Sequence, residues 1–298
     1  MKPDNDQPSQ HFLEDTRVID LSQYVPGPFA TRQFADLGAE VIKIEPPDGD
    51  PARNFMHTGD DAVSPVYRHL NRGKRVARLD LKSKSGKQNL VALLADADVL
   101  LESYRPGVLQ RLGFGRDTLE AINPRLIHCA LSGYGQTGPY KLRAGHDLNY
   151  CAASSQLSVS GIAEKPVMSF PPIADHAGAM QASIAILAAL YARERSGRGA
   201  FVDISLFEAS LSWQYAPLLQ HISRRAEYVI NGGAACYNIY QCEDLEFISL
   251  GAIETHFWKN FCEAVKRPLW IDRQYETMPQ HTLISALSEL FSQQPLNY

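Results

Sequence analysis

The sequence predicts an α/β protein, with a large parallel-sheet domain followed by a smaller α+β domain. From about residue 17 to residue 206, short apolar strand patterns alternate with amphipathic helix patterns, which is typical of crossover units in a parallel sheet. After residue 206 the alternation ends, and two adjacent strand patterns are joined by a short turn. The 298 residues are long enough for about two domains.

The first crossover unit is the clearest one. Residues 17–22 (RVIDLS) predict a buried strand, residues 29–37 predict an amphipathic helix that ends at Gly38, and residues 40–45 (EVIKIE) predict a second strand. The same alternation continues along the large domain. The further elements that we expect there are strands 75–81, 99–103, 126–132 and 200–206, and helices 84–97, 107–112, 117–122 and 177–195.

The rest of the chain predicts a helix over residues 207–223, strands over 237–242 and 247–250, and helices over 255–265 and 282–292. The N-terminus is polar, so we expect it to be disordered. We therefore expect a disordered tail over residues 1–13, a large domain over 14–206, a helical linker over 207–225 and a small domain over 226–298.

Composition excludes several classes of function. The net charge of −4 is spread over interspersed charges, so no basic surface for nucleic acid is predicted. The longest apolar run, residues 184–192, is too short to span a membrane. The five cysteines are odd in number and form no CxxC motif, which argues against a disulfide framework or a metal site. A reducing, cytoplasmic location fits these features best.

The segment at residues 133–138 matches the GxGxxG pattern and follows a predicted strand. A dinucleotide fingerprint also needs a helix that begins directly after the glycines, so that its N-terminus points at the pyrophosphate. Here Pro139 follows, and Gly145 interrupts the next stretch. We interpret the segment as a glycine loop that borders a pocket.

A histidine and two acids on separate segments, His146, Asp175 and Glu254, could form one proton-transfer site. Each residue also has a simpler interpretation. His146 could be a structural histidine, Asp175 could be the N-cap of the helix expected from residue 177, and Glu254 could cap the helix expected from residue 255. The choice between these interpretations depends on the surrounding motifs.

Two groups of cations lie beside predicted strands. Residues 71–75 (NRGKR) precede one strand, whereas Arg105 and Arg111 follow the carboxyl end of another. Ligands of open α/β sheets bind at the carboxyl ends of the strands, and guanidinium groups suit phosphate. These groups favour a phosphorylated ligand over solvated surface charge.

A series of motifs runs from about residue 14 to about residue 265 and resembles CoA-transferase family III, which also contains the α-methylacyl-CoA racemases. The motifs are VIDLS at 18–22, PGP at 26–28, DLGAEVIKIE at 36–45, LDLK at 79–82, RPGV at 105–108, LSGYG at 131–135, RERSG at 193–197 and VDISL at 202–206. This resemblance implies a Rossmann-like large domain, a smaller domain, and a homodimer of two interlocked chains.

The resemblance also implies which residues bind coenzyme A, which would be part of the substrate rather than a permanently bound cofactor. It implies no metal. The matching residues are Leu79, Asp80, Leu81, Lys82, Ser103, Tyr104, Arg105, Arg111, Gly145, Asp147, Leu148, Asn149 and Tyr150.

His146 decides which reaction the resemblance favours. In racemase-like members a GHD motif supplies a catalytic histidine, which matches His146, together with acids that match Asp175 and Glu254. The resemblance thus implies epimerisation of a 2-methylacyl-CoA, with His146 and Asp175 on opposite faces of an enolate and Glu254 orienting the imidazole. Backbone N–H groups at the start of the Asp175 helix are the expected donors to the enolate oxygen.

The alternative is a CoA-transferase. In that branch a tyrosine commonly stands in place of the histidine, and the matching aspartate attacks the thioester and carries CoA to a second acid through an anhydride.

Two departures from the family pattern bear on these expectations. Pro46 stands where racemase-like members can carry an arginine, which predicts the loss of one nucleotide contact. Family members also continue beyond the position of Tyr298, so a second alternative is a truncated chain that binds CoA without turnover.

Overall fold

The computed structural model describes residues 11–55 and 63–297, and the chain divides into two compact units. The first unit comprises Met1–Cys151 and Phe170–Ser212, and the second comprises Ala152–Ser169 and Trp213–Tyr298. Most of the tail expected over residues 1–13 lies outside the described residues.

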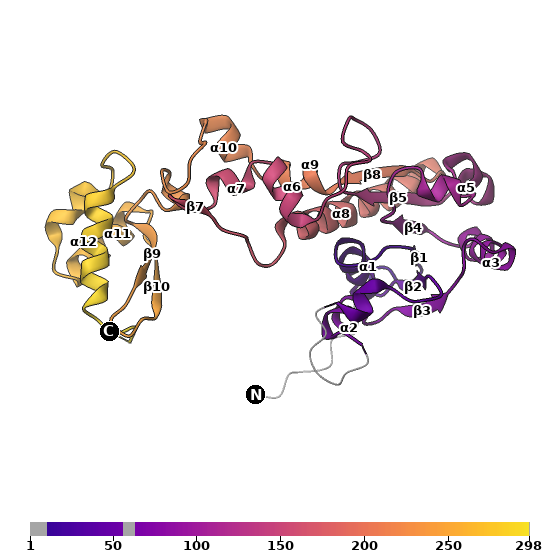
Figure 1. Ribbon diagram of the computed structural model, residues 1–298, viewed down its shortest axis with the longest axis horizontal. Coiled ribbons are helices and arrows are strands. Elements are labelled where there is room, and N and C mark those ends of the chain that lie inside the picture. Colours follow the sequence, from indigo (N-terminus) through magenta and orange to yellow (C-terminus); the bar gives the residue numbers. More distant parts are fainter. Residues whose placement is uncertain (1–10, 56–62, 298) are drawn as a thin grey trace. The chain divides into compact units, whose positions relative to one another are not determined.

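A parallel sheet of six strands forms the centre of the first unit, in the order β3-β2-β1-β4-β5-β8 (Figure 1). Val18 of β1 pairs with Val41 of β2 on one side and with Val99 of β4 on the other. The expected parallel sheet is thereby confirmed. The strands are β1 (Arg17–Asp20), β2 (Glu40–Glu45), β3 (Arg75–Arg78), β4 (Val99–Glu102), β5 (Ile127–Ser132) and β8 (Phe201–Ser205).

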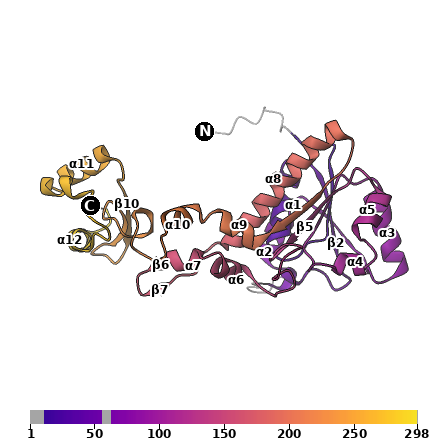
Figure 2. The same ribbon diagram turned by 90° about the horizontal axis from the view of Figure 1, so that it is seen from above.

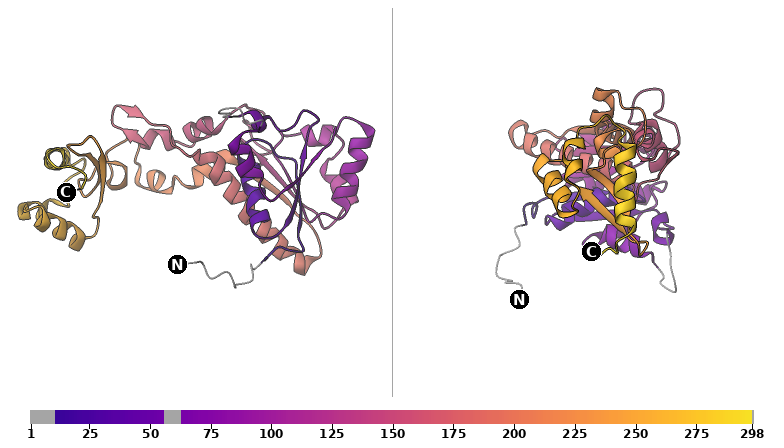
Figure 3. Two further views of the ribbon diagram at one scale, coloured as in Figure 1. Left: turned by 90° about the horizontal axis from the view of Figure 1, so that it is seen from below. Right: turned by 90° about the vertical axis from the view of Figure 1, so that its left-hand side faces the viewer.

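Helices cover both faces of this sheet. Helices α1 (Pro26–Asp36) and α8 (Ile173–Ser196) lie on one face, and α3 (Lys84–Ala95), α4 (Val108–Arg111) and α5 (Arg116–Ile122) lie on the other (Figures 2 and 3). The described part of the unit also contains α2 (Pro65–Asn71) beside α1, α9 (Leu206–Ser212) beside α8, and a 3-10 helix at Pro51–Asn54. Most of α6 (Asp147–Ala153) belongs to it as well, and the last two residues of α6 belong to the second unit. This two-faced covering explains why β1, β4 and β5 are buried along almost their whole length.

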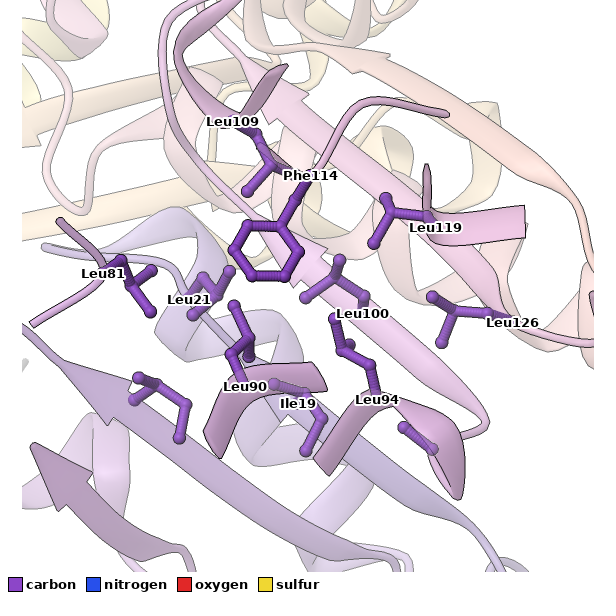
Figure 4. Close-up of a cluster of buried hydrophobic side chains, with 12 residues drawn as sticks. Ile19, Leu21, Leu81, Leu90, Leu94, Leu100, Leu109, Phe114, Leu119 and Leu126 are labelled. Carbon is purple, nitrogen blue, oxygen red and sulfur yellow. The ribbon is translucent and has the colours of Figure 1, made fainter. Parts of the chain in front are cut away.

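The core between the sheet and helices α3 to α5 is built from leucines of several elements (Figure 4). Ile19 of β1 and Leu100 of β4 are fully buried, and so are Leu90 and Leu94 of α3. Leu90 and Leu94 are four residues apart, so both face the sheet from one side of their helix.

Helix α8 is long and apolar enough, by length and composition, to cross a membrane. In the structure it packs against α1, α9, β5 and β8, and Ala174, Ala179 and Ile186 are fully buried. These contacts are those of a core helix in a globular unit.

Two helices differ from expectation at residues that matter below. The helix expected from residue 177 begins at Ile173, with Pro172 in the N-cap position, so Asp175 lies inside the first turn rather than before the helix. The single helix expected over residues 207–223 is two helices, α9 and α10 (Tyr215–Gln220). Pro217 explains the break, because its ring would clash with the carbonyl group of Trp213 in a continuous helix.

The second unit contains the predicted antiparallel hairpin of β9 (Tyr237–Gln241) and β10 (Phe247–Gly251), followed by α11 (Thr255–Ala264) and α12 (His281–Ser292). Its core surrounds the fully buried Trp258, whose indole N–H donates to the carbonyl of Trp270 at 3.0 Å. Shorter elements complete it: α7 (Gln156–Val159), β6 (Gly161–Ile162), β7 (Lys165–Pro166), and 3-10 helices at Val229–Asn231 and Pro268–Arg273.

Two buried ion pairs join residues of β1 and β2 to segments outside these strands in the first unit. The Lys74 ammonium lies 3.0 Å from the carboxylate of Asp20, and Lys43 lies 2.9 Å from Asp50, with these side chains almost fully buried. Burial alone would raise the pKa of Asp20, but the charges of Lys74 and Lys43 outweigh it and hold that pKa well below its usual range. Asp20 is therefore ionised at neutral pH, and Lys74 and Lys43 stabilise its buried negative charge.

Replacing Lys74 by methionine should destabilise the protein by about 3–5 kcal/mol, because it removes the cation that is paired with a buried carboxylate. Chemical denaturation at pH 7 measures this loss. Arg72→Met is the matched control, since Arg72 pairs with Asp36 at the exposed surface and such pairs contribute about 1 kcal/mol or less. Equal effects of the two substitutions would contradict the structural role of Lys74.

Candidate active site

A cavity of about 270 Å³ opens at the carboxyl ends of β1, β4 and β5. All of its lining residues belong to the first unit. They are Gln23, Tyr24, Pro26, Ser103, Tyr104, Arg105, Pro106, Leu131, Ser132, Gly133, Lys141, Arg143, Ala144, Gly145, His146, Tyr150, Asp175 and Leu206.

The strand order explains why a cavity forms here. After β1 the chain crosses to β2 and β3, whereas after β4 it crosses to β5 and β8 on the other side. The crossovers leave in opposite directions, so a crevice opens between the carboxyl ends of β1 and β4, where ligands of such sheets bind. Residues 23–26 and 103–106 form the two sides of this crevice.

His146 reaches the cavity from the loop before α6. Its backbone N–H donates to the side-chain oxygen of Asn149 at 3.0 Å, and its carbonyl accepts from the Asn149 N–H at 2.8 Å. The hydroxyl group of Tyr150 donates to the carbonyl of Gly145 at 2.7 Å. The loop is thus held by the first turn of the helix that follows it.

Two glycines leave room for Tyr150. A Cβ atom at Gly133 would lie 2.4 Å from the Tyr150 hydroxyl oxygen, and one at Gly145 would lie 2.7 Å from its ring, so larger residues would displace this side chain. Gly133 belongs to the GxGxxG segment, after which the next helix begins only at Asp147. The glycine segment therefore borders the cavity, as expected, and does not form a dinucleotide fingerprint.

Asp175 lies in the first turn of α8 and is half-buried on the cavity wall. Its backbone N–H donates to the carboxylate of Asp147 at 3.0 Å. Burial, followed by the negative charge of Asp147, raises the pKa of Asp175 to about 7. At neutral pH its carboxyl group can therefore give or take a proton, as a general acid or base must.

The bond from Asp175 to Asp147 also bears on the backbone N–H groups expected to bind an enolate oxygen, one of which it engages. The backbone N–H of Asp175, at the start of α8, already has an acceptor and is not free to bind an enolate oxygen. Positive charge lines the cavity instead, from Arg105, Lys141 and Arg143. Such charge stabilises an anionic ligand or intermediate by attraction.

The structure brings only some of the predicted site residues to this cavity. His146 and Asp175 line it together, as do Ser103, Tyr104, Arg105, Gly145 and Tyr150. In the described part of the chain, the other predicted coenzyme A residues of this unit are not on its wall. They are Leu79, Asp80, Leu81 and Lys82 after β3, Arg111 in α4, and Asp147, Leu148 and Asn149 in α6.

Glu254 belongs to the second unit, so its predicted interaction with His146 stays a prediction. It occupies the N-cap position of α11, and its side chain makes no capping hydrogen bond. Glu254 therefore stands at the start of α11, as the simpler interpretation expected, but without a side-chain hydrogen bond to the helix.

Sequence reasoning missed several cavity residues. Gln23 and Tyr24 follow β1 directly, and Tyr24 has a left-handed backbone with φ of 62°. The rule that ligands bind at the carboxyl ends of strands could have identified both, because β1 itself was predicted. Lys141 and Arg143 had no comparable signal, because they lie in a loop with no strand end beside them.

The described residues give less support to a site in the second cavity or to a metal site. A second cavity, of about 160 Å³, lies between α5 and β8, but there Arg198 pairs with Glu120 and Arg116 stacks on Phe201. Among the described residues, no three His, Cys, Asp or Glu side chains are grouped to hold a metal ion. The larger cavity is thus the candidate active site.

Comparison with known proteins identifies the family to which the chain belongs. A model described as CoA-transferase family III matches residues 13–298. The chain is 38% identical to α-methylacyl-CoA racemase from Mus musculus over 83% of its own length, and spans 62% of that protein. It is 33% identical to acetyl-CoA:oxalate CoA-transferase from Acetobacter aceti, over 93% of this chain and 74% of that protein.

Solved structures agree with this assignment. A hypothetical protein from Mycobacterium tuberculosis superimposes with a TM-score of 0.82 at 31% identity, over 96% of this chain and 79% of that one. The fold is therefore shared with that protein. The chain belongs to CoA-transferase family III.

Proposed function

We propose that this chain epimerises a 2-methylacyl-CoA by moving the α-proton through an enolate. The observation that carries the proposal is that His146 and Asp175, from two separate segments, line one cavity. Epimerisation needs one group to remove a proton from one face of the α-carbon and another to return a proton to the opposite face. A neutral imidazole and a protonated carboxyl group form such a pair.

Asp175 suits the role of the group that returns a proton, because its pKa is raised to about 7, by burial first and by the charge of Asp147 next. In one direction His146 takes the proton while protonated Asp175 donates, and in the other direction the roles reverse. The positive charges of Arg105, Lys141 and Arg143 would favour the enolate and the phosphates of coenzyme A.

A CoA-transferase is the second candidate function, and the accessible carboxyl group of Asp175 favours it. That group could attack the thioester carbonyl, release CoA as a thiolate and form a mixed anhydride. Proton transfer is preferred here because the position of His146 on the same cavity is otherwise unexplained.

The first experiment incubates the protein with a 2-methylacyl-CoA of single configuration and a free carboxylic acid in D2O. We expect deuterium at the α-position while CoA stays on its original acyl group, as measured by mass spectrometry. Transfer of CoA to the free acid, with no deuterium incorporated, would establish the transferase instead. CoA binding without either reaction would contradict both candidates for this chain.

The second experiment replaces His146 by alanine. Exchange of the α-proton should fall by at least about 10²-fold, because the group that removes the proton is lost. Binding of CoA, measured by calorimetry, should stay nearly unchanged. His281→Ala is the matched control, since His281 is exposed at the start of α12 in the second unit. Unchanged exchange in the His146 variant would rule out its role as a base.

We also propose that the chain forms a homodimer through one face of α8. Met180, Ile184, Leu187 and Tyr191 are spaced by four, three and four residues, so they form one stripe along the helix. All four are exposed, Ile184 to 61% and Tyr191 to 67%. An apolar stripe of this kind is typical of a helix that packs against a second protein surface.

Replacing Ile184 by glutamate should convert the dimer to a monomer, because it places a charge in the middle of the stripe. Sedimentation velocity measures the change. Glu194→Lys alters the charge of an exposed residue on the same helix and should leave the dimer intact. A dimer that survives Ile184→Glu would contradict this interface.

A further inference from the structure

Asp147 joins two parts of the candidate active site that are far apart in the sequence. It begins α6, and its Oδ1 atom accepts the backbone N–H of Asp175, 28 residues away, at 3.0 Å. Helix α8 receives no side-chain cap from Pro172, the residue before it. A first-turn N–H of α8 is thus satisfied from another helix, and this contact ties α8 to α6.

The Asp147 carboxylate is held on its other side as well. Its Oδ2 atom accepts from the thiol of Cys151, one turn further along α6, at 3.6 Å. Burial raises the pKa of Cys151 to about 11, so the thiol keeps its proton and can donate. With both oxygens bound, the orientation of the carboxylate is determined by α6 and α8 together.

The adjacent residues His146 and Asp147 therefore have different structural roles. His146 lies on the cavity wall, whereas Asp147 does not and contacts the backbone of the turn that carries Asp175. Because His146 and Asp147 are adjacent in the chain, the contact from Asp147 to Asp175 also sets the separation of the two groups proposed to exchange protons.

We propose that Asp147 is a positioning residue that clamps the Asp175 turn to the His146 segment and whose charge opposes ionisation of the Asp175 carboxyl group. This inference rests on the proposed function, because it concerns the proton that Asp175 would donate. It assigns to Asp147 a role distinct from contact with coenzyme A.

The charge of Asp147 acts in a defined direction. A carboxylate close to Asp175 disfavours ionisation of Asp175, and this effect adds to that of burial in raising the pKa. Other ionisable groups lie on α8 itself, on the elements packed against it and on the cavity wall. They are His146, Tyr150 and Cys151 from the loop and α6, His176 on α8, Glu208 on α9, and Tyr104, Arg105, Lys141 and Arg143 on the wall.

Asp147→Asn separates the two parts of the role, because the amide oxygen can still accept the Asp175 N–H while the charge is gone. The Asp175 pKa should then fall toward the usual value of an aspartate. Donation requires protonated Asp175, so the upper limb of the pH profile of α-proton exchange should move to lower pH by roughly one unit, a tenfold loss above that limb.

The experiment compares the pH profiles of α-deuterium incorporation for the wild-type protein, Asp147→Asn and Asp147→Ala. Asp117→Asn is the matched control, since it removes an exposed charge from the first turn of α5 and should leave the profile unchanged. Asp147→Ala should lower the rate further, because it also removes the acceptor. A profile of Asp147→Asn identical to that of the wild type would overturn the proposal.

A second measurement does not require activity. NMR of protein labelled with 13C in its aspartate carboxyl groups follows the titration of Asp175, which Asp175→Asn assigns. We expect a midpoint near 7 in the wild type, as the raised pKa of about 7 implies, and a lower midpoint in Asp147→Asn. A wild-type midpoint near 4, the usual value of an aspartate, would overturn the inference about Asp147 even if exchange is observed. Absence of exchange with a midpoint near 7 would instead contradict only the proposed function.

Discussion

The reversal of the crossover direction between β1 and β4 is the constraint on which the first unit depends. It leaves the carboxyl ends of these two strands without a covering helix, and residues 23–26 and 103–106 border the resulting crevice. Asp20 is the last residue of β1, and it forms a buried ion pair with Lys74, the residue before β3. The strand ends that shape the cavity are thus fixed by charge as well as by apolar packing.

A single short segment, residues 145–150, then brings the chemistry to that crevice. Tyr150 of α6 fills the space that Gly133 and Gly145 leave open, and its hydroxyl group donates to the carbonyl of Gly145. These contacts attach the loop that carries His146 to α6. Asp147, in the same segment, contacts the first turn of α8. One segment therefore places His146 on the cavity wall and also contacts the turn that carries Asp175.

The two candidate reactions would use the carboxyl group of Asp175 differently. A half-buried Asp175 near a second carboxylate can hold a proton at neutral pH, which suits proton transfer, and its ionised form can attack a thioester. The imidazole of His146 lies on the same cavity, and this is the observation on which the proposal of proton transfer rests.

The sequence by itself determined the strands of the parallel sheet and most of its helices, because periodicity reports which faces are buried, but it did not predict α2 or α6. It placed β2 and the β9–β10 hairpin nearly to the residue, and it selected His146 and Asp175 by residue type. Only the tertiary structure decided which segments share the cavity, that Asp175 lies inside α8, and that Asp147 contacts it across 28 residues. The raised pKa of Asp175 likewise arises from packing between distant segments, and periodicity carries no information on which segments meet.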